Sequence, residues 1–541
     1  MKKFLIFLVA IITTVSIGVT FYQFAKNDEI IKVNTDTVYI NYGEKLSLDD
    51  LGFSHKEVNK QTEINFNAGG EEVTSIIKYD ELSKCFVPTS KGGATTIKIT
   101  TTNRKYKSFN INVIVGIGTE ENPYYITTEQ QLFDVTNKHI NDNACFQLVN
   151  DINITNVHAP IGLTEDGCRE FTGTFDGNYK TISNLKIASC DNGGLFASLS
   201  TNSLVCNLNV KNAVIDGEFN NVGTIAGICY GTINKVIVHN SAINNTRANS
   251  NTGAVVGNLK TDDTNKITAS ILRTTAYSDN NIKIVANGNV GGLAGCVDSA
   301  IIHACHSDVV LENNSNGTTG GLIGTLVVDP YTYVRESYSL SNISGKGACG
   351  NIAGLISINP NSKFADITKE LVLVGLYYDK TLNNFSGAGH DTYNFMSASS
   401  FAVNGKTTEE LKTKNTYVYY INNSNDIIYW DNVWYLADGA FPTLVFTATF
   451  DDIILEGGTQ LPTNPDTDLS NPESPNTSSI IISNKTELIN AFQNPSKTVS
   501  GNYILSDNID LEGYDWIPVS FTGSFKSSGN NNFSISNFIW F

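Results

Sequence analysis

The stretch NVGGLAG, Asn289–Gly295, has close copies in NVGTIAG at Asn221–Gly227 and TTGGLIG at Thr318–Gly324. The first glycine of this motif stands at six positions: Gly193, Gly223, Gly253, Gly291, Gly320 and Gly350. The intervals between successive positions are 30, 30, 38, 29 and 30 residues. A period near thirty residues predicts stacked supersecondary units, and the one long interval predicts a loop inserted in the third unit, around Thr261–Lys266.

Each unit contains two short β-rich runs, the apolar residues of the motif and a second run such as NKVIVHN at Asn234–Asn240. Neither run is long enough for a helix. Leucine-rich repeats have a similar period, but their pattern of leucines and asparagines is missing. In a parallel β-helix each coil stacks its strands about 4.8 Å above the previous one, and glycine is needed where the chain bends sharply or where small residues stack in register. We therefore predict an all-β fold, a parallel β-helix-like solenoid of about six 30-residue repeats.

The glycine motif resembles the core of the GLUG-repeat proteins, with GGLAG at Gly291–Gly295, GGLIG at Gly320–Gly324 and the degenerate forms GTIAG, GAVVG and GNIAG. The segment before the motifs, residues 124–187 and here called the opening segment, resembles the start of that family in YYITTEQQL, LVNDINI and FTGTFDGNYKTISNLKI. WDNVWYLADGAFPTL at Trp430–Leu444 resembles its closing segment. The resemblance covers roughly residues 117 to 446. It implies a solenoid in a bacterial surface protein, because such repeats occur in adhesin-like proteins and beside peptidase domains.

Residues 31–116 alternate polar and apolar side chains, as in TVYINYG at Thr37–Gly43 and SFNINVIV at Ser108–Val115. A period of two predicts half-buried antiparallel strands, the last two of them forming a hairpin. Together with GGATTIKITTT at Gly92–Thr102, this pattern resembles bacterial immunoglobulin-like domains. The resemblance implies a small β-sandwich ahead of the solenoid.

The solenoid is predicted over residues 117–450, where Thr127 or Thr128 caps one short helix. Residues 451–479, rich in Pro, Asn, Ser and Thr, are predicted to be a linker. Residues 480–541 are similar in sequence to the opening segment, but no glycine motif follows them. We therefore predict an incomplete second copy of the opening segment, and expect either a chain cut from a longer protein or an open edge that docks on a partner.

Residues 1–30 begin with Lys2 and Lys3, followed by 22 uncharged residues, Phe4–Ala25. This length is sufficient to cross a hydrocarbon core of about 30 Å, and the terminal position disfavours a buried core helix. The segment predicts export, as either a cleaved signal peptide or a retained membrane anchor. An N-terminal hydrophobic helix therefore completes the predicted fold, and the predicted location is extracellular, on the cell surface.

The charge balance excludes one class of partner. The 36 Lys and Arg against 53 Asp and Glu give a net charge of -17, which repels phosphate backbones, so we predict no nucleic-acid partner. The nine cysteines include no C-x-x-C pair, and several lie in apolar runs such as IAGICYG at Ile225–Gly231. We expect free thiols that act as small hydrophobic residues rather than disulfides.

The motif HACHSD, His303–Asp308, briefly suggests a metal site. In a regular strand His303 and Cys305 face one way while His306 and Asp308 face the other, so the four do not converge without a bulge. His390 beside Asp391 is a similarly weak lead, and the chain carries none of the zinc-protease, hydrolase-elbow or phosphate-loop strings. We predict no catalytic, cofactor-binding or metal-ligating residues, and no cofactor.

Acidic residues matter because parallel β-helices often carry polysaccharide lyases and glycosidases, which need carboxylates close together. The candidates are scattered over different units: Asp262, Asp263, Asp308, Glu312 and Asp329. Asp176 in FDG is expected to be a turn residue, since Lys526 replaces it in the second copy. An enzymatic role is therefore the less favoured reading.

The 23 tyrosines form clusters, as in DPYTYVRESYS at Asp329–Ser339 and YVYYINNSNDIIYW at Tyr417–Trp430. Such clusters suit sugar faces and protein epitopes, but they also fill cores, and the sequence leaves both open. The function predicted is an exported surface protein whose solenoid binds a glycan or a host or matrix protein. A carbohydrate-active β-helix enzyme and a passive surface stalk are the alternatives, and ligand identity and oligomeric state are not predicted.

Overall fold

The computed structural model describes most of residues 37–444, with its longest gaps at 51–63, 69–74, 102–108, 263–267 and 421–426, and short segments between 480 and 540. Contacts divide the chain into one unit of residues 1–453 and another of residues 454–541. The predicted N-terminal segment, residues 1–30, and the predicted linker lie outside the described residues. Among the residues described, no helix is long and apolar enough to cross a membrane.

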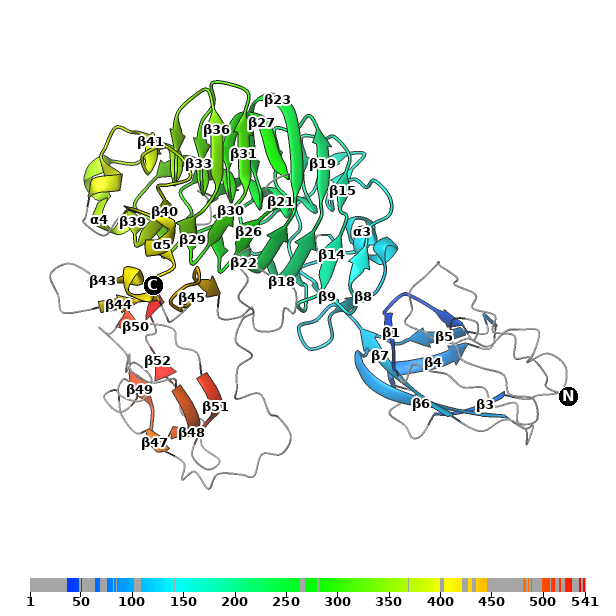
Figure 1. The fold of residues 1–541 in the computed structure, drawn as a ribbon. Coiled ribbons are helices and arrows are strands. Elements are labelled where there is room, and N and C mark those ends of the chain that lie inside the picture. Colours follow the sequence, from blue (N-terminus) through cyan, green and yellow to red (C-terminus); the bar gives the residue numbers. More distant parts are fainter. Residues whose placement is uncertain are drawn as a thin grey trace, which may run out of the picture. The chain divides into compact units, whose positions relative to one another are not determined.

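Three parallel sheets wind into a β-helix (Figure 1), which confirms the predicted fold class. One coil contains β27 (Lys283–Gly291), β28 (Ala294–Asp298), β29 (Ile301–His303) and β30 (His306–Asp308). Strand β31 (Val310–Asn313) pairs in parallel with β27 and begins the next coil. Strand β28 pairs in parallel with the strands of the coils before and after it, as β27, β29 and β30 also do. The backbone of each coil is therefore hydrogen-bonded to the next, and the coils share one interior.

The strands are assigned to the sheets as follows. The 7-stranded sheet contains β28 and β17 (Phe196–Leu199), β21 (Ala226–Cys229), β24 (Val256–Lys260), β33 (Ile323–Val328), β38 (Ala353–Ile358) and β41 (Ala388–Asp391). The 10-stranded sheet contains β27, β31 and β15 (Lys186–Ile187), β16 (Asn192–Gly193), β19 (Val214–Gly217), β20 (Asn221–Val222), β23 (Ala242–Gly253), β32 (Thr319–Gly320), β36 (Asn342–Gly345) and β37 (Cys349–Gly350). The 16-stranded sheet contains β29, β30 and β8 (Tyr124–Ile126), β9 (Cys145–Leu148), β10 (Ile152–Asn153), β13 (Thr174–Asp176), β14 (Thr181–Ser183), β18 (Leu204–Lys211), β22 (Thr232–His239), β25 (Ser270–Leu272), β26 (Thr275–Tyr277), β34 (Tyr333–Arg335), β35 (Tyr338–Ser339), β39 (Leu373–Val374), β40 (Leu376–Asp379) and β42 (Val403–Lys406).

The interior of the coils is a column of aliphatic side chains, capped by aromatic ones at the first coils. Phe146, Phe171 and Phe196 stack with ring centroids 5.8 and 5.0 Å apart. Further along, the inward position of the 16-stranded sheet is filled by a fully buried series: Val205, Ile233, Ile271, Ile302, Val334 and Leu373. Burying branched side chains one above another is the main stabilising contribution in such a repeat.

The opening segment begins with α3 (Glu129–Lys138), the helix that the capping pattern predicted. Thr128 is its N-cap, and the Thr128 hydroxyl accepts a hydrogen bond of 3.2 Å from the backbone N–H of Gln131.

The extra residues of the long third interval lie where the sequence predicted them. Strand β24 pairs with β28 up to Lys260, and β25 resumes the next pairing at Ser270, so the extra residues lie between these two strands.

Before the solenoid, two small sheets contain β1 (Thr37–Asn41), β7 (Phe109–Gly116), β6 (Gly93–Thr101) and β3 (Ile64–Ala68), and β2 (Leu46–Ser47), β5 (Cys85–Pro88) and β4 (Ile77–Asp80). Strands β6 and β7 form the predicted antiparallel pair, but β1 runs parallel to β7. The prediction of antiparallel strands throughout was therefore wrong for β1. The likeness to immunoglobulin-like domains stays a prediction.

The remaining elements are short. In the first unit they are β11 (Leu163–Thr164), β12 (Gly167–Cys168), β43 (Val418–Tyr420), β44 (Ile427–Tyr429), β45 (Trp434–Tyr435), β46 (Thr443–Leu444), α4 (Lys369–Val372), α5 (Thr408–Leu411), η1 (Phe364–Asp366), η2 (Phe395–Ser397) and η3 (Lys414–Tyr417). The second unit contains β47 (Ile480–Ile482), β48 (Val499–Leu505), β49 (Ile509–Asp510), β50 (Asp515–Trp516), β51 (Phe521–Ser527), β52 (Ile535–Ser536) and β53 (Ile539–Trp540). The parallel order β47, β48, β51 has the same form as β8, β9, β13 in the opening segment. The sequence similarity between residues 480–541 and the opening segment thus corresponds to the same order of paired strands.

The glycines that every later unit keeps are the first and the last of the motif. A Cβ on Gly295 would overlap the backbone N of Thr252 and lie 2.9 Å from the carbonyl O of Gly257 one coil earlier. The middle position is more tolerant, since Thr224, Ala254 and Asn351 occupy it in other units. At the first and last positions every later unit keeps such a backbone contact, which side chains cannot move to relieve. Where the middle position is glycine, as at Gly292 and Gly321, a Cβ would also meet the backbone of the next coil, whereas the other units have room for a side chain there.

The first unit departs from the sequence alignment by one residue. Gly193 pairs with Val222 rather than with Gly223, so Gly194 takes the place of the first glycine in this unit. The following strand recovers the register, since Phe196 pairs with Ala226. The predicted equivalence of Gly193 with the other first glycines was wrong, because the unit is one residue shorter at this turn.

A ladder of asparagine side chains runs along the solenoid, two residues before the first glycine of each motif. In each step the Nδ2 of one asparagine donates to the Oδ1 of the asparagine one coil earlier, at a distance of 2.9 Å: Asn221 to Asn192, Asn251 to Asn221 and Asn289 to Asn251. The hydroxyl of Thr318 ends the ladder with a 2.9 Å bond to Asn289 Oδ1. The ladder satisfies half-buried amides and fixes the register of neighbouring coils.

A column of left-handed residues runs along the 16-stranded sheet. It lies within β18 and β22, and in later coils it separates two strands, as β25 from β26 and β29 from β30. The equivalent corner residues and their φ angles are Asn207 (50°), Lys235 (56°), Arg273 (46°), Ala304 (54°), Glu336 (46°) and Gly375 (63°). Only the last is glycine, so the other coils bear the strain of a left-handed conformation in order to turn the chain. The corner changes the face to which the side chains after it point.

We expect Gly295→Ala to lower the free energy of unfolding by at least about 2 kcal/mol, because the added Cβ meets backbone atoms that cannot rotate away. Urea denaturation followed by circular dichroism measures this. Ala254→Gly, a change at the tolerant middle position, should cost less than about 1 kcal/mol. Equal stability of the Gly295→Ala variant and the parent protein would contradict the assignment of this glycine to a backbone contact.

Asn251→Ala should lower the free energy of unfolding by about 1–3 kcal/mol, since it removes two ladder bonds and leaves its neighbours unpaired. The exposed Asn316, for which no side-chain hydrogen bond is found in the part of the chain described, provides the control. Asn316→Ala should change stability by less than about 0.5 kcal/mol. If both variants unfold at the same urea concentration, the ladder does not stabilise the coils.

Candidate functional site

The side chains of HACHSD lie on different faces of the coil. The left-handed corner at Ala304 interrupts the strand, so Cys305 points into the solenoid core while His303 stays half-buried on the outside. His303 Nε2 lies 3.1 Å from Oε2 of Glu336 on the next coil. The predicted pairing of His303 with Cys305 on one face was therefore wrong, because the corner rotates the chain. Within the described ranges, no group of three potential metal ligands comes together.

His306 is buried under a second apolar cluster, outside the coils. Its ring stacks on Tyr338 at 4.2 Å, and its Nε2 has no hydrogen-bond partner. Residues of the closing segment cover this face, including Trp430 and Trp434. The hydroxyl of Tyr338 donates to the carbonyl O of Pro442 at 2.6 Å, which ties the segment to the coil. Burial without a charged partner lowers the pKa of His306 to about 3.

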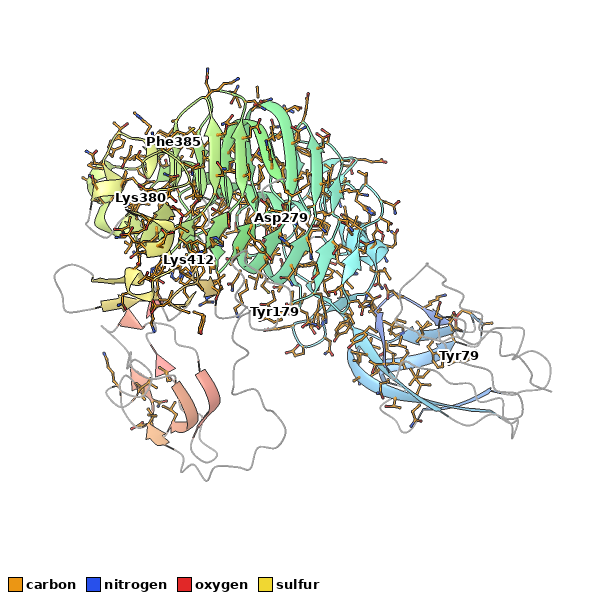
Figure 2. The ribbon with its side chains drawn as sticks, in the orientation of Figure 1. Tyr79, Tyr179, Asp279, Lys380, Phe385 and Lys412 are labelled. Atoms are coloured by element: carbon orange, nitrogen blue, oxygen red, sulfur yellow. The ribbon has the colours of Figure 1, made fainter. Side chains whose placement is uncertain are left out.

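Three of the tyrosines lie in an apolar core rather than on the surface. Tyr338, Tyr377 and Tyr417 are buried in the cluster beneath the closing segment, whereas Tyr331 is 59% exposed in a turn. Figure 2 shows Tyr179 and Phe385 at the periphery of the solenoid, where both side chains are partly exposed. The choice between binding surface and core, which the sequence left open, thus falls to core for these three tyrosines.

The predicted carboxylates lie on different faces. Glu312 pairs with Lys283 at 3.0 Å on the 10-stranded sheet, and Asp329 accepts bonds from the backbone of Tyr331 and the hydroxyl of Thr332 within a turn. Asp308 lies at the end of β30 in the 16-stranded sheet. Asp263 falls outside the described residues. The three described here do not assemble into a catalytic group.

Two other carboxylates named in the sequence analysis have structural roles, and one pair of carboxylates was not predicted from the sequence. Asp176 accepts a 2.8 Å bond from the backbone of Asn178, as expected of a turn residue. Asp391 accepts a 2.8 Å bond from the backbone N–H of Met396 in η2. Glu170 was not singled out from the sequence; burial and then the charge of Asp262 raise its pKa. The two carboxylates are close enough to interact, although 92 residues separate them.

A cavity lies where the turn after β1 meets the opening segment. It has a volume of about 350 Å³, and its walls include Tyr42, Tyr124, Tyr125, His139 and Phe146 together with Asn41, Glu44, Gln131, Asp134 and Lys138. Three contacts build it. Asn41 Nδ2 donates to the carbonyl O of Tyr125 at 2.8 Å, Tyr125 N donates to Asn41 Oδ1 at 2.7 Å, and Gln131 Nε2 donates to Glu44 Oε1 at 2.9 Å.

Aromatic rings form the apolar part of this cavity. Tyr124 stacks on His139 with centroids 4.0 Å apart, and Phe146 packs against Tyr124 at 5.6 Å. Tyr42 is 50% exposed at the rim. Within the described part of the chain, no hydrogen bond is found for the hydroxyls of Tyr42, Tyr124 and Tyr125. The cavity therefore combines ring faces with hydroxyl groups that can bond a ligand.

Sequence reasoning missed this cavity for a physical reason. Its two walls come from NYGE at Asn41–Glu44 and from the opening segment, and Asn41 and Tyr125 are 84 residues apart. The sequence carries two separate signals, the aromatic pair in NPYY and the turn-forming NYG in another part of the chain. Nothing in their spacing indicates that they meet.

Comparisons with known proteins give matches to parts of the chain. No family model matches, so the likeness to GLUG-repeat proteins stays a prediction. One segment is 32% identical over 163 residues to Halomucin of Haloquadratum walsbyi, covering 27% of this chain and 2% of that protein. Another match is 35% identical over 131 residues to a protein described as a Gly-rich membrane protein in Evansella cellulosilytica, covering 23% of this chain and 15% of that one. The chain thus spans only a small part of either relative.

Solved structures whose backbone follows a similar path include a Bacteroides ovatus protein described as an immunoglobulin A1 protease. It is 18% identical, with a TM-score of 0.39, over 61% of this chain and 94% of that one. A structure described as IgA1 Protease is 18% identical with a TM-score of 0.34, over 64% of this chain and 26% of that one. Similarity at this level carries no argument about activity.

We expect acid to destabilise this protein through His306. The pKa of His306 is lower in the folded chain than the ordinary value near 6.5. Between these two pKa values, His306 is therefore protonated in the unfolded chain and neutral in the folded chain. Stability is therefore full above about pH 6.5 and falls as the pH drops toward 3, by about 3 kcal/mol at pH 4. Urea denaturation at pH 7, 5 and 4 measures this, and His306→Phe should lose about 3 kcal/mol less than the parent protein between pH 7 and pH 4.

Other titrating groups affect both proteins equally, so the difference between parent and variant isolates His306. His303→Phe, at the half-exposed neighbour, is the control and should follow the parent protein. Parallel pH curves for the parent and His306→Phe would contradict the buried neutral histidine.

Proposed function

We propose that this chain is an exported bacterial cell-surface protein that adheres to a glycan through the cavity beside the opening segment. The observation that carries the proposal is the combination of ring faces, unbonded tyrosine hydroxyls and amide groups in about 350 Å³. Sugar rings pack their C–H faces on aromatic rings while their hydroxyls bond to polar side chains. A volume of this size suits one or two sugar residues.

The uncharged N-terminal stretch and the names of the two relatives support an extracellular location. Phe4–Ala25 is long enough for export across a membrane. Halomucin and the Gly-rich membrane protein are named for a mucin and for a membrane, and each matches this chain over at least 131 residues. A long β-helix holds such a cavity on a rigid framework, because each coil is bonded to the next.

One observation favours the second candidate function, a carbohydrate-active enzyme. The charge of Asp262 raises the pKa of Glu170 after the larger effect of burial, and cleavage of a glycosidic bond ordinarily uses two carboxylates that flank it. We favour binding, because the pair lies in neither the aromatic cavity nor a described cleft. Release of reducing sugar that is lost in a Glu170→Gln variant would favour the enzyme instead.

We expect the full-length protein to bind neutral glycans on an array, and Tyr42→Ala to weaken that binding about tenfold or more, since truncating an exposed aromatic anchor commonly costs this much. Tyr331→Ala is the matched control, because Tyr331 is similarly exposed but distant in sequence and outside the cavity. Titration calorimetry on the best array ligand measures both variants.

The outcomes separate the candidates. Binding that Tyr42→Ala leaves intact would remove the cavity from the proposal, and no glycan binding together with capture of purified host matrix proteins would replace a glycan with a protein ligand. No binding of either kind would leave the passive stalk as the better description. Melting temperatures of the two variants show whether each still folds.

A further inference from the structure

The charges around the aromatic cavity are unequal. Its walls carry two carboxylates, Glu44 and Asp134, and one ammonium group, Lys138. Lys138 Nζ lies 3.1 Å from Oδ2 of Asp134, one turn apart on α3. Glu44 has neutral partners instead, since it accepts a 3.0 Å bond from the backbone N of Asn41 and a 2.9 Å bond from Gln131. Among the described residues, no cation is found paired with Glu44 on this wall.

Groups near the cavity add to the same sign. Asp142 lies 3.0 Å from Nδ1 of His139, and it raises the pKa of Tyr124 after the larger effect of burial. Glu120 and Glu121 are exposed nearby and raise the pKa of Cys145 in the adjoining strand, again after burial. The whole chain carries a net charge of -17. The field at the cavity is negative from several directions, and a ligand bearing a carboxylate or sulfate would enter against it.

We infer that the cavity selects uncharged sugars over anionic ones, with Glu44 and Asp134 setting the preference and Lys138 limiting it. This inference rests on the proposed glycan binding at the same cavity. The ligand class is then a neutral hexose or pentose residue, and uronic acids, sialic acids and sulfated sugars are disfavoured. Repulsion by one unbalanced charge at the distance of a wall residue reduces affinity roughly threefold to tenfold at low salt.

The test uses two pairs of probes that differ only at C6: the methyl glycosides of glucose and glucuronic acid, and those of galactose and galacturonic acid. Dissociation constants are measured by ligand-observed NMR on the full-length protein at pH 8, where histidine is ordinarily neutral. In 20 mM salt, the neutral member of at least one pair should bind threefold to tenfold more tightly, and 500 mM salt should shrink that ratio.

Three variants locate the charge. Asp134→Asn leaves Lys138 unpaired and should reduce the neutral-to-uronide ratio at least threefold, whereas Lys138→Gln should increase it. Glu312→Gln removes a carboxylate paired with a lysine on the 10-stranded sheet and should leave the ratio unchanged. Thermal unfolding of each variant confirms that the ratio is measured on folded protein.

The failures are distinguishable. Equal binding of neutral and uronide probes, or a ratio that Asp134→Asn and Lys138→Gln leave unchanged, would overturn the charge selection while leaving glycan binding in place. Absence of binding to all four glycosides and to the glycan array would overturn the proposed function and this inference with it.

Discussion

Contact between backbone and backbone at the first and last glycines of each motif is the constraint on which the rest of the structure depends. At Gly295 and its equivalents the chain passes so close to the neighbouring coils that a Cβ would meet peptide atoms. Peptide groups cannot change rotamer, so these contacts fix the path of each coil. The three parallel sheets and their common interior follow, because every coil with the same turn must stack on the one before it.

Once the path is fixed, side chains refine it. The asparagine ladder holds successive coils in register from Asn192 to Thr318. The left-handed corner lets the 16-stranded sheet turn without glycine in most coils, and it also decides which side chains face outward. Cys305 enters the core and His306 leaves it for this reason. A local backbone conformation therefore determines whether a residue is part of the interior, of the surface or of the cluster beneath the closing segment.

The two ends of the solenoid show how an open coil is used. At the C-terminal side the closing segment covers Tyr338 and Tyr377, and the hydroxyl of Tyr338 donates to the carbonyl O of Pro442 within that segment. The hydroxyl of Tyr377 donates to the carbonyl O of Thr416, which precedes the segment. At the N-terminal side α3 and the turn after β1 cover the first coils but leave a cavity between them. Covering apolar surface with aromatic residues that keep a polar tip serves both ends. At the N-terminal end the covering elements leave a cavity lined by aromatic rings and tyrosines.

The sequence alone determined the repeat, because glycine spacing reports directly where backbones touch. It also predicted helix α3, with its cap at either Thr127 or Thr128, and the pairing of β6 with β7, because these are local patterns. It could not distinguish the strict glycines from the tolerant middle one, nor detect the shift of one residue at Gly193, because both depend on the neighbouring coil. The burial of the tyrosines, the direction of Cys305 and the aromatic cavity were decided by the tertiary structure. The cavity joins Asn41 to Tyr125 across 84 residues, and no local pattern specifies such a contact.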